Sequence, residues 1–560
     1  MFCSGSSAIQ LHHAAVGAVL ALLSTVMNSV CAASMSAAEM VAAGKQLYRD
    51  GHTVEGKQLK AAVHNDVPLQ ATDLACANCH RRSGLGSSEG GIGIPPIAGT
   101  TLFMTQSTSL VRDYQKGELS NISRPAYTLQ TLAQALRDGI TASGRPMLPL
   151  MPRYQVSDDD VAALAAYLKT LSGTSAEGLT EHDIHFATII TPAATSEARA
   201  AMLDVMNAYV AGKNAGTRGE TRRAERAPFH REWMYSAYRK WVLHEWTLRG
   251  PEESWGAQLE EYYRQQPVFA VLGGIGQGDW KPVHEFCEQY EMPCLFPHLT
   301  AAPSQAERDF YSIYFSRGLL LEAEVLAAHL RRHGHSAARV LQVLRPTPDA
   351  MAAAATLRRV LSLAGEDHII NAHDIVDSTY WRQLLQQTQP DILVLWLHAD
   401  DLAALTSGDA SSPPPTVTYL SSTLLPAVDH AAIGGSGRVY LLHPFQLPGE
   451  NRKLERFRIW ARQAGVQISD LRLQADAYFV ATLLGEALMH IRGNLSREYL
   501  IERIEHMTDS MLYTSTYPRL GLAPAQRYAA KGAYVWRIDQ EPDQAEWIVP
   551  QQHQQQTAKR

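Results

Sequence analysis

The chain is poor in cysteine, in net charge and in long apolar runs, and each shortage excludes a class of protein. After residue 32 no segment approaches the stretch of about 18 apolar residues that a membrane-spanning helix needs, so we expect no transmembrane span in a mature chain. The formal charge of −6 argues against a nucleic-acid partner. No fixed-period repeat is present. The 560 residues are too many for one core and indicate several domains.

The longest apolar run lies near the start of the chain, at residues 14–27. Its length is that of a signal peptide, and Val30-Cys31-Ala32 offers small residues for cleavage. We therefore expect residues 1–32 to be a signal peptide and the mature protein to be periplasmic. The residues before the run include no Lys or Arg, so an uncleaved N-terminal anchor is the alternative.

Four of the six cysteines follow the leader, and two of them form the motif Cys76-Ala77-Asn78-Cys79-His80. This pattern is typical of c-type haem attachment, because one turn of chain brings both thiols to the vinyl groups and the adjacent imidazole to the iron. A redox-active pair or half of a zinc site is the alternative. A zinc site needs further ligands, and the chain has no second Cys-x-x-Cys. The motif predicts one covalent haem c with His80 as an iron ligand.

The other two cysteines, Cys287 and Cys294, are seven residues apart. An oxidising compartment would allow a disulfide between them. Two buried thiols are equally compatible with the sequence, so both possibilities remain open.

Two helices are expected around the haem motif. Residues 37–49 have apolar side chains at helical spacing, and residues 157–171 begin with Ser157, a good N-cap. Gly44 would allow the two helices to approach closely, with Tyr48 and Tyr167 packed at the crossing. Between them, residues 144–154 are rich in proline and contain Met147 and Met151, either of which could place a thioether over the iron.

Residues 37–173 resemble a class I mono-haem cytochrome c. The resemblance implies an all-α domain, which we place at residues 33–173, with the methionine of Met151-Pro152 as sixth ligand and Met147 as the alternative. It also implies that a carbonyl of Pro95 or Pro96 accepts a hydrogen bond from His80. With both axial positions filled, the expected chemistry is outer-sphere one-electron transfer.

The pattern changes after a small, polar segment, residues 174–181, which we interpret as a linker. Strand-like apolar runs then alternate with amphipathic helical stretches, which predicts an α/β fold with parallel sheets. Residues 182–550 are too many for one such sheet and suggest two lobes. The Gln-rich residues 551–560 are expected to be disordered.

This second half resembles the type I periplasmic binding proteins, the branched-chain amino-acid binding family of ABC importers, most clearly at residues 271–303. In amino-acid-binding members a serine in the first turn and a threonine in a Pro-x-x-Thr loop hold the ligand carboxylate. Thr300 matches the threonine, but Gln277 stands at the serine position and the nearby Asp279 would repel a carboxylate. A neutral or cationic ligand is therefore possible. Trp280 either stacks on a ligand or packs at its helix start.

The sequence thus predicts a periplasmic electron carrier fused to a module that binds a small ligand or a partner. Its expected redox partner is a dehydrogenase or another cytochrome. The alternatives are an ABC-type solute receptor whose haem senses redox state, and a haem enzyme, which would need an open axial site. An electron carrier is favoured over a catalyst. In residues 182–560 no metal-ligand cluster is specific enough to name a site.

Overall fold

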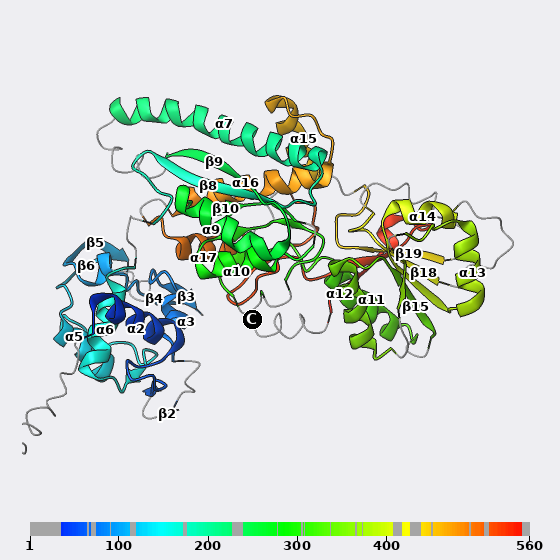
Figure 1. Ribbon diagram of the computed structural model, residues 1–560. Helices are drawn as coiled ribbons and strands as arrows, with labels where there is room; N and C mark the ends of the chain where they lie inside the picture. The colour runs from blue at the N-terminus through cyan, green and yellow to red at the C-terminus, as the bar shows by residue number, and fades with distance from the viewer. Residues whose placement is uncertain are drawn as a thin grey trace, which may run out of the picture. The chain divides into compact units, whose positions relative to one another are not determined.

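The computed structural model forms two compact units, Met1–Leu171 and Ser172–Arg560 (Figure 1). It describes residues 35–63, 67–68, 74–89, 91–112, 119–171, 176–226, 239–276, 278–303, 306, 309–335, 338–363, 367–371, 373–406, 417–425, 438–449, 452–491, 494–508 and 515–550. The expected signal peptide, the C-terminal tail and Gln277 lie outside these residues. Within them, no helix combines the length and the apolar character needed to cross a membrane.

Helices α2 (Ala37–Asp50) and α6 (Asp158–Leu168) pack together in the first unit. Helix α6 begins with a capping box, in which the Ser157 hydroxyl accepts from the Asp160 N–H and the Asp160 carboxylate accepts from the Ser157 N–H. Two orphan N–H groups of the helix end are thereby satisfied, and the start of the helix is set by its own residues.

The crossing of these two helices depends on a glycine. A Cβ atom at Gly44 would lie 2.0 Å from the carbonyl oxygen of Ala163, so no other residue fits without moving a backbone. The rings of Tyr48 and Tyr167 pack beside this contact with their centroids 5.4 Å apart. The predicted close crossing is confirmed.

The first unit also contains short strands, so the prediction of an all-α domain is incomplete. Its further helices are α3 (Cys76–His80), α4 (Gly99–Leu102) and α5 (Leu129–Asp138). The strands form three small antiparallel sheets: β2 (Val67–Pro68), β1 (Ala61–Val63) and β7 (Arg153–Tyr154); β3 (Ser87–Glu89) and β4 (Ile92–Ile94); β5 (Gln106–Arg112) and β6 (Leu119–Arg124). Most of these strands have only two or three residues and carry little alternation of polar and apolar residues. The longer β5 and β6 are mainly polar, so they too lack the pattern of a half-buried strand.

The second unit is built from two α/β lobes, and the first lobe has a parallel sheet. Strand β8 (Asp183–Ile190) pairs with β9 (Lys240–Thr247) along one edge. Along its other edge it pairs first with β10 (Ala270–Leu272) and then with β11 (Ile275–Gly276). The sheet continues through β12 (Cys294–Leu295), β13 (His298–Leu299) and β14 (Ser312–Ile313).

Helices cover both faces of this first-lobe sheet, so its central strand is apolar on both sides. Ile184 and Phe186 of β8 point to one face and Ala187 and Ile189 to the other. The first face is covered by α7 (Ser196–Arg226), α15 (Arg452–Ala464), α16 (Leu471–His490) and α17 (Arg497–Met507), and the second by α9 (Trp255–Gln265) and α10 (Lys281–Gln289).

The second lobe repeats this arrangement. Its strands run in parallel in the order β16 (His368–Ile369), β15 (Val340–Leu344), β17 (Ile392–Trp396), β18 (Val417–Ser421) and β19 (Arg438–His443), followed by the antiparallel β20 (Ala533–Arg537) and β21 (Glu546–Ile548). One face packs on α11 (Leu319–Arg332) and α12 (Pro348–Leu361), and the other on α13 (Ser378–Thr388) and α14 (Ala399–Thr406). The predicted parallel α/β fold is confirmed.

The chain passes between the two lobes three times, after β14, after β19 and after α17. Each lobe is therefore completed by a segment that comes late in the sequence: α15 to α17 for the first lobe, and β20 and β21 for the second. Residues that are far apart along the chain meet where the lobes join.

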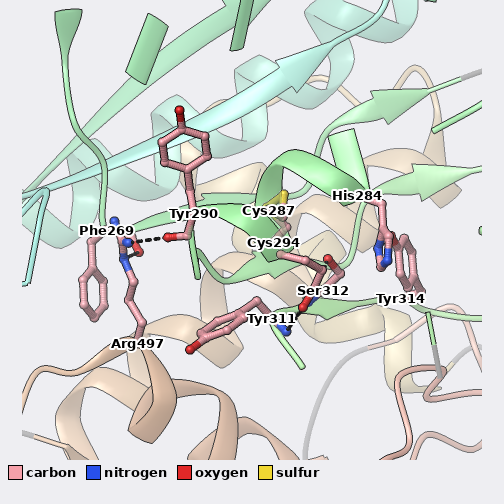
Figure 2. The surroundings of a disulfide bond; sticks show 10 residues. Phe269, His284, Cys287, Tyr290, Cys294, Tyr311, Ser312, Tyr314 and Arg497 are labelled. Carbon is pink, nitrogen blue, oxygen red and sulfur yellow. Dashed lines mark hydrogen bonds between the residues drawn. A yellow bond between two sulfur atoms is a disulfide. The ribbon is translucent and has the colours of Figure 1, made fainter. Parts of the chain in front are cut away.

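The structure resolves the open question about Cys287 and Cys294, which form a disulfide between α10 and β12 (Figure 2). Both residues are buried. In the same region Arg497 of α17 donates to the carbonyl oxygens of Phe269 at 3.1 Å and Tyr290 at 3.0 Å. The disulfide therefore lies inside the first lobe, where it ties a helix to the adjacent strand.

Candidate functional site

The motif residues Cys76, Cys79 and His80 all lie on the single turn of helix α3. Cys76 is 7 % exposed and His80 is 6 % exposed, so the turn faces the core of the first unit. Among the described residues neither cysteine takes part in a disulfide. One short helix therefore presents two thiols and an imidazole together, as covalent haem attachment requires.

The imidazole of His80 is held by the loop that follows α3. Its Nδ1 lies 2.9 Å from the carbonyl oxygen of Pro95, and because a carbonyl can only accept, Nδ1 carries the proton. Nε2 then keeps its lone pair for a metal, which is the usual arrangement of a ligating histidine. Burial lowers the pKa of His80, which further favours the neutral ring, although the Pro95 contact opposes that shift. Of the two prolines considered, Pro95 makes this contact.

The loop can approach His80 because of a glycine. Gly86 has φ of +81° and its N–H donates to the His80 carbonyl oxygen at 3.1 Å. A Cβ at this position would lie 2.2 Å from the carbonyl oxygen of Ile94. Only glycine allows the chain to bring Pro95 under the ring.

The thiol of Cys76 is kept protonated by its surroundings. Burial raises its pKa to about 12, and the neighbouring Cys79 adds to the shift. Tyr154 is buried in the same hydrophobic cluster as Cys76, and its hydroxyl donates to the carbonyl oxygen of Leu74 at 3.2 Å. Burial and both cysteines raise the pKa of Tyr154. Reduced thiols beside a neutral imidazole in an apolar setting fit a covalently attached haem.

Both candidate thioether ligands lie at the edge of the same core. Met147 and Met151 are half-buried and pack against the hydrophobic cluster that includes Cys76. Met147 is fixed by its N–H, which donates to the Gly139 carbonyl oxygen at 2.8 Å, and the Met151 carbonyl oxygen accepts from the Arg153 guanidinium. The choice of Met151 over Met147 stays a prediction.

In the second unit, the sequence candidates do not converge on one ligand. Trp280 is 3 % exposed and packs in the core of the first lobe, where a Cβ at Gly276 would lie 2.4 Å from its ring. This position matches the packing alternative and leaves no face of the ring for a ligand. Thr300 is half-buried, and Asp279 is exposed.

Near the start of α10, two backbone N–H groups already donate hydrogen bonds to carboxylates of the protein itself. The N–H of Asp279 donates to Glu252 Oε1 at 3.0 Å, and the N–H of Gly278 donates to the carboxylate of Asp349. Asp349 belongs to α12 of the second lobe, so this contact joins the lobes. Burial raises the pKa of Asp349 to about 7, and the nearby charges of Asp279 and Glu252 add to the shift.

A second group of mainly polar residues lies where the lobes meet, and no sequence pattern predicted it. We call Glu322, Ser422, Phe445 and Arg472 the interlobe cluster. Arg472 donates to the Ser422 carbonyl oxygen at 3.0 Å, and its guanidinium carbon lies 3.6 Å from the centre of the Phe445 ring. These residues come from α11, the turn after β18, the second crossing and α16.

Glu322 is the buried acid of the interlobe cluster. It is fully buried, and one carboxylate oxygen accepts from the N–H of Thr423 at 3.1 Å and from its hydroxyl at 2.7 Å. Among the described residues the other oxygen, Oε2, has no hydrogen-bond partner. Burial raises the pKa of Glu322 to about 7, although hydrogen bonds from Ser421 and Thr423 and the charge of Arg472 oppose the shift. The cluster therefore carries an acid that can titrate near neutral pH.

Comparisons with known proteins divide the chain at a similar place. The family model described as cytochrome c matches residues 41–172. No curated protein matches the chain.

The similar solved structures align with about two thirds of the chain. A leucine-binding protein from Thermotoga maritima is 12 % identical over 66 % of this chain and 99 % of its own, with a TM-score of 0.44. A branched-chain amino-acid ABC transporter protein from Thermus thermophilus with bound valine is 12 % identical over 66 % and 97 %, with a TM-score of 0.48. A solute-binding protein from R. palustris in complex with benzoate is 10 % identical over 66 % and 96 %, with a TM-score of 0.46.

Proposed function

We propose that this protein is a periplasmic electron carrier, in which residues 33–173 hold one haem c and residues 182–550 bind a small ligand or a redox partner. The main observation in support is the geometry at α3. Two reduced thiols and His80 lie on one turn, and His80 Nδ1 is 2.9 Å from the Pro95 carbonyl oxygen. The match of residues 41–172 to the cytochrome c family supports this assignment.

Five residues of the first unit have defined parts in this proposal. Cys76 and Cys79 would anchor the haem through thioether bonds, His80 Nε2 would ligate the iron, and Met151 would supply the second protein ligand. The Pro95 carbonyl fixes the orientation of His80 and makes it a better donor. A haem held between imidazole and thioether supplies one-electron chemistry at a raised potential. With both His80 and Met151 as ligands, the iron would have no place for a substrate, which favours a carrier over an enzyme.

The second unit is proposed to take a neutral or cationic ligand. In the resemblance noted above, donors near residues 277–279 would hold a ligand carboxylate. Here the N–H groups of Gly278 and Asp279 already donate to Asp349 and Glu252. A ligand carboxylate would have to displace these groups and would meet the negative charge of Glu252 and Asp279 at close range, which disfavours its binding. A redox partner, such as a dehydrogenase or another cytochrome, is the other proposed occupant.

Covalent haem is tested by changing the two cysteine pairs of the chain separately. The full-length protein is produced with the host's cytochrome maturation system, and haem is measured by pyridine haemochrome absorption and by haem staining after denaturation. We expect one haem per chain in the wild type and none bound covalently in the double variant Cys76→Ala, Cys79→Ala. The double variant Cys287→Ala, Cys294→Ala is the matched control and should keep its haem. A colourless wild-type protein would overturn the proposal.

The sixth ligand is tested by comparing the two methionines. In the Met151→Ala variant we expect the thioether-to-iron absorption band to disappear and carbon monoxide to bind the reduced protein, with Met147→Ala unchanged in both respects. The reverse result would assign Met147. Ready binding of carbon monoxide by the reduced wild type would instead indicate an open-site haem enzyme.

The receptor alternative makes a different prediction. If the haem senses redox state for a solute receptor, a ligand that raises the thermal unfolding midpoint of the full-length protein should also shift its reduction potential. An electron carrier with an independent binding module should show the first effect without the second. The measurement is a thermal-shift screen of amino acids, neutral solutes and organic cations, followed by potentiometric titration with each ligand found.

A further inference from the structure

A compact group of metal-ligating side chains lies in the second lobe. His329 is in the last turn of α11, His333 follows directly after that helix, and Glu546 begins the edge strand β21. The sequence carries the histidines at a spacing of four, which places both on one face of a helix. It gives no sign of Glu546, because the two parts are 217 positions apart.

The three side chains point their donor atoms at one another. His329 Nδ1 lies 2.9 Å from Glu546 Oε2, and His333 Nε2 lies 3.1 Å from the same oxygen. The potential ligand atoms all lie within 4.8 Å of one another, and the two imidazole rings have centroids 4.4 Å apart. Donors this close together need only small side-chain movements to share a single metal ion.

The surroundings hold these groups in place. The ring of His329 packs against Tyr419 and Tyr440 on the second-lobe sheet, with centroid distances of 5.8 Å and 6.0 Å. The antiparallel pairing of β20 with β21 sets Glu546 opposite Val535. Two of the three ligands, His329 and Glu546, therefore lie on a helix and a strand, which position ligands more reproducibly than loops do, and His333 is the residue that caps the helix.

We propose that His329, His333 and Glu546 bind one zinc ion. Two imidazoles and a carboxylate are a donor set that suits zinc, with water as the fourth ligand of a tetrahedral site. All three residues belong to the second lobe, apart from the haem motif and from the interlobe cluster. The inference is independent of the proposed electron transfer, since it needs neither the haem nor a solute.

The alternative to a zinc site is a metal-free network of hydrogen bonds that includes Arg332. Its guanidinium pairs with Glu546 Oε1, so the group could be a network of hydrogen bonds in which protonated histidines and Arg332 neutralise the acid. The two cases differ in what Arg332 does. A zinc ion at Oε2 is repelled by Arg332, whereas a metal-free network depends on it.

The experiment is equilibrium dialysis of the full-length holoprotein against buffered zinc, with metal analysis and amino-acid analysis of each sample. We expect one zinc per wild-type chain above the background of surface histidines. His333→Ala should weaken this binding by roughly tenfold or more. The His333 side chain is 48 % exposed, against 9 % for His329, so its removal threatens folding least.

Two controls make the result decisive. His373→Ala removes another exposed histidine of the second lobe and should leave zinc binding unchanged. Arg332→Gln should leave it unchanged or tighten it. Zinc should also raise the thermal unfolding midpoint of the wild type but not of His333→Ala. Equal zinc binding by the wild type and His333→Ala, or loss of binding in Arg332→Gln, would overturn the proposal.

Discussion

The two units assemble their candidate sites in different ways. In the first unit two thiols and an imidazole come from five consecutive residues, and the hydrogen-bond partner Pro95 lies only 15 positions from His80. In the second unit Glu322 meets Thr423 across 101 positions, and Glu546 meets His329 across 217. A local motif carries its chemistry wherever it folds, whereas a dispersed site exists only when the whole topology forms.

The two units also differ in the contacts that stabilise them. The first unit depends on one close helix crossing, while the second has a disulfide and two sheets that are each buried on both faces. We therefore expect a single substitution to lower the stability of the first unit more than that of the second. In the second unit we expect stability to depend on the contacts between the lobes.

The largest effect is expected at the helix crossing. Gly44→Val places a side chain against the Ala163 backbone and Tyr167, which should destabilise the first unit by about 3 kcal/mol. Chemical denaturation followed by haem absorption measures this loss. Gly93→Ala is the control in the same unit, since a Cβ there meets nothing within 4 Å. Equal stability of the two variants would show that the helices can separate without penalty.

The disulfide gives the next effect. Replacing Cys287 and Cys294 by alanine removes a cross-link that closes a short loop, so the unfolded chain gains conformational entropy. This should lower the stability of the second unit by about 2 kcal/mol. Far-ultraviolet circular dichroism follows the loss, while the haem signal reports the first unit. A matching shift in the haem signal would contradict independent unfolding of the two units.

The smallest expected effect is a pH dependence at the lobe contact. The pKa of Asp349 is raised from its ordinary value of 3.8 to about 7, so the folded chain binds a proton that the unfolded chain has released. Its contribution to stability is therefore full below pH 3.8 and is lost as the pH rises towards 7. Asp349→Asn should raise the unfolding midpoint at pH 8 by about 2 °C relative to the wild type.

The comparison at acid pH is the control for this variant. Near pH 4 the wild-type carboxyl is largely protonated and resembles the amide, so the advantage of Asp349→Asn should vanish. Calorimetry of both proteins between pH 4 and pH 8 measures the difference. A constant offset at all pH values would mean that the Asp349 carboxyl does not titrate in this range.

Much of the scaffold could be predicted because its signals are local. The N-cap Ser157 and the Gly44 approach marked the two helices of the first unit, and alternating strand and helix patterns indicated the lobes. Most strands of the first unit were not predicted because two or three residues carry no period, and β5 and β6 were not predicted because their residues are mainly polar. Trp280 could not be assigned from sequence, since a ring at a helix start packs or stacks according to what the neighbouring backbone leaves open, and Gly276 leaves room for it.

The amino-acid sequence by itself determined the Cys76-x-x-Cys79-His80 turn and the apolar character of the strands, because covalent spacing and side-chain period are properties of short stretches. Only the tertiary structure decided that Asp349 reaches the Gly278 N–H, that Arg472 lies on Phe445 and that Glu546 meets His329. The three passages of the chain between the lobes bring these residues together, and no local preference encodes where distant segments meet.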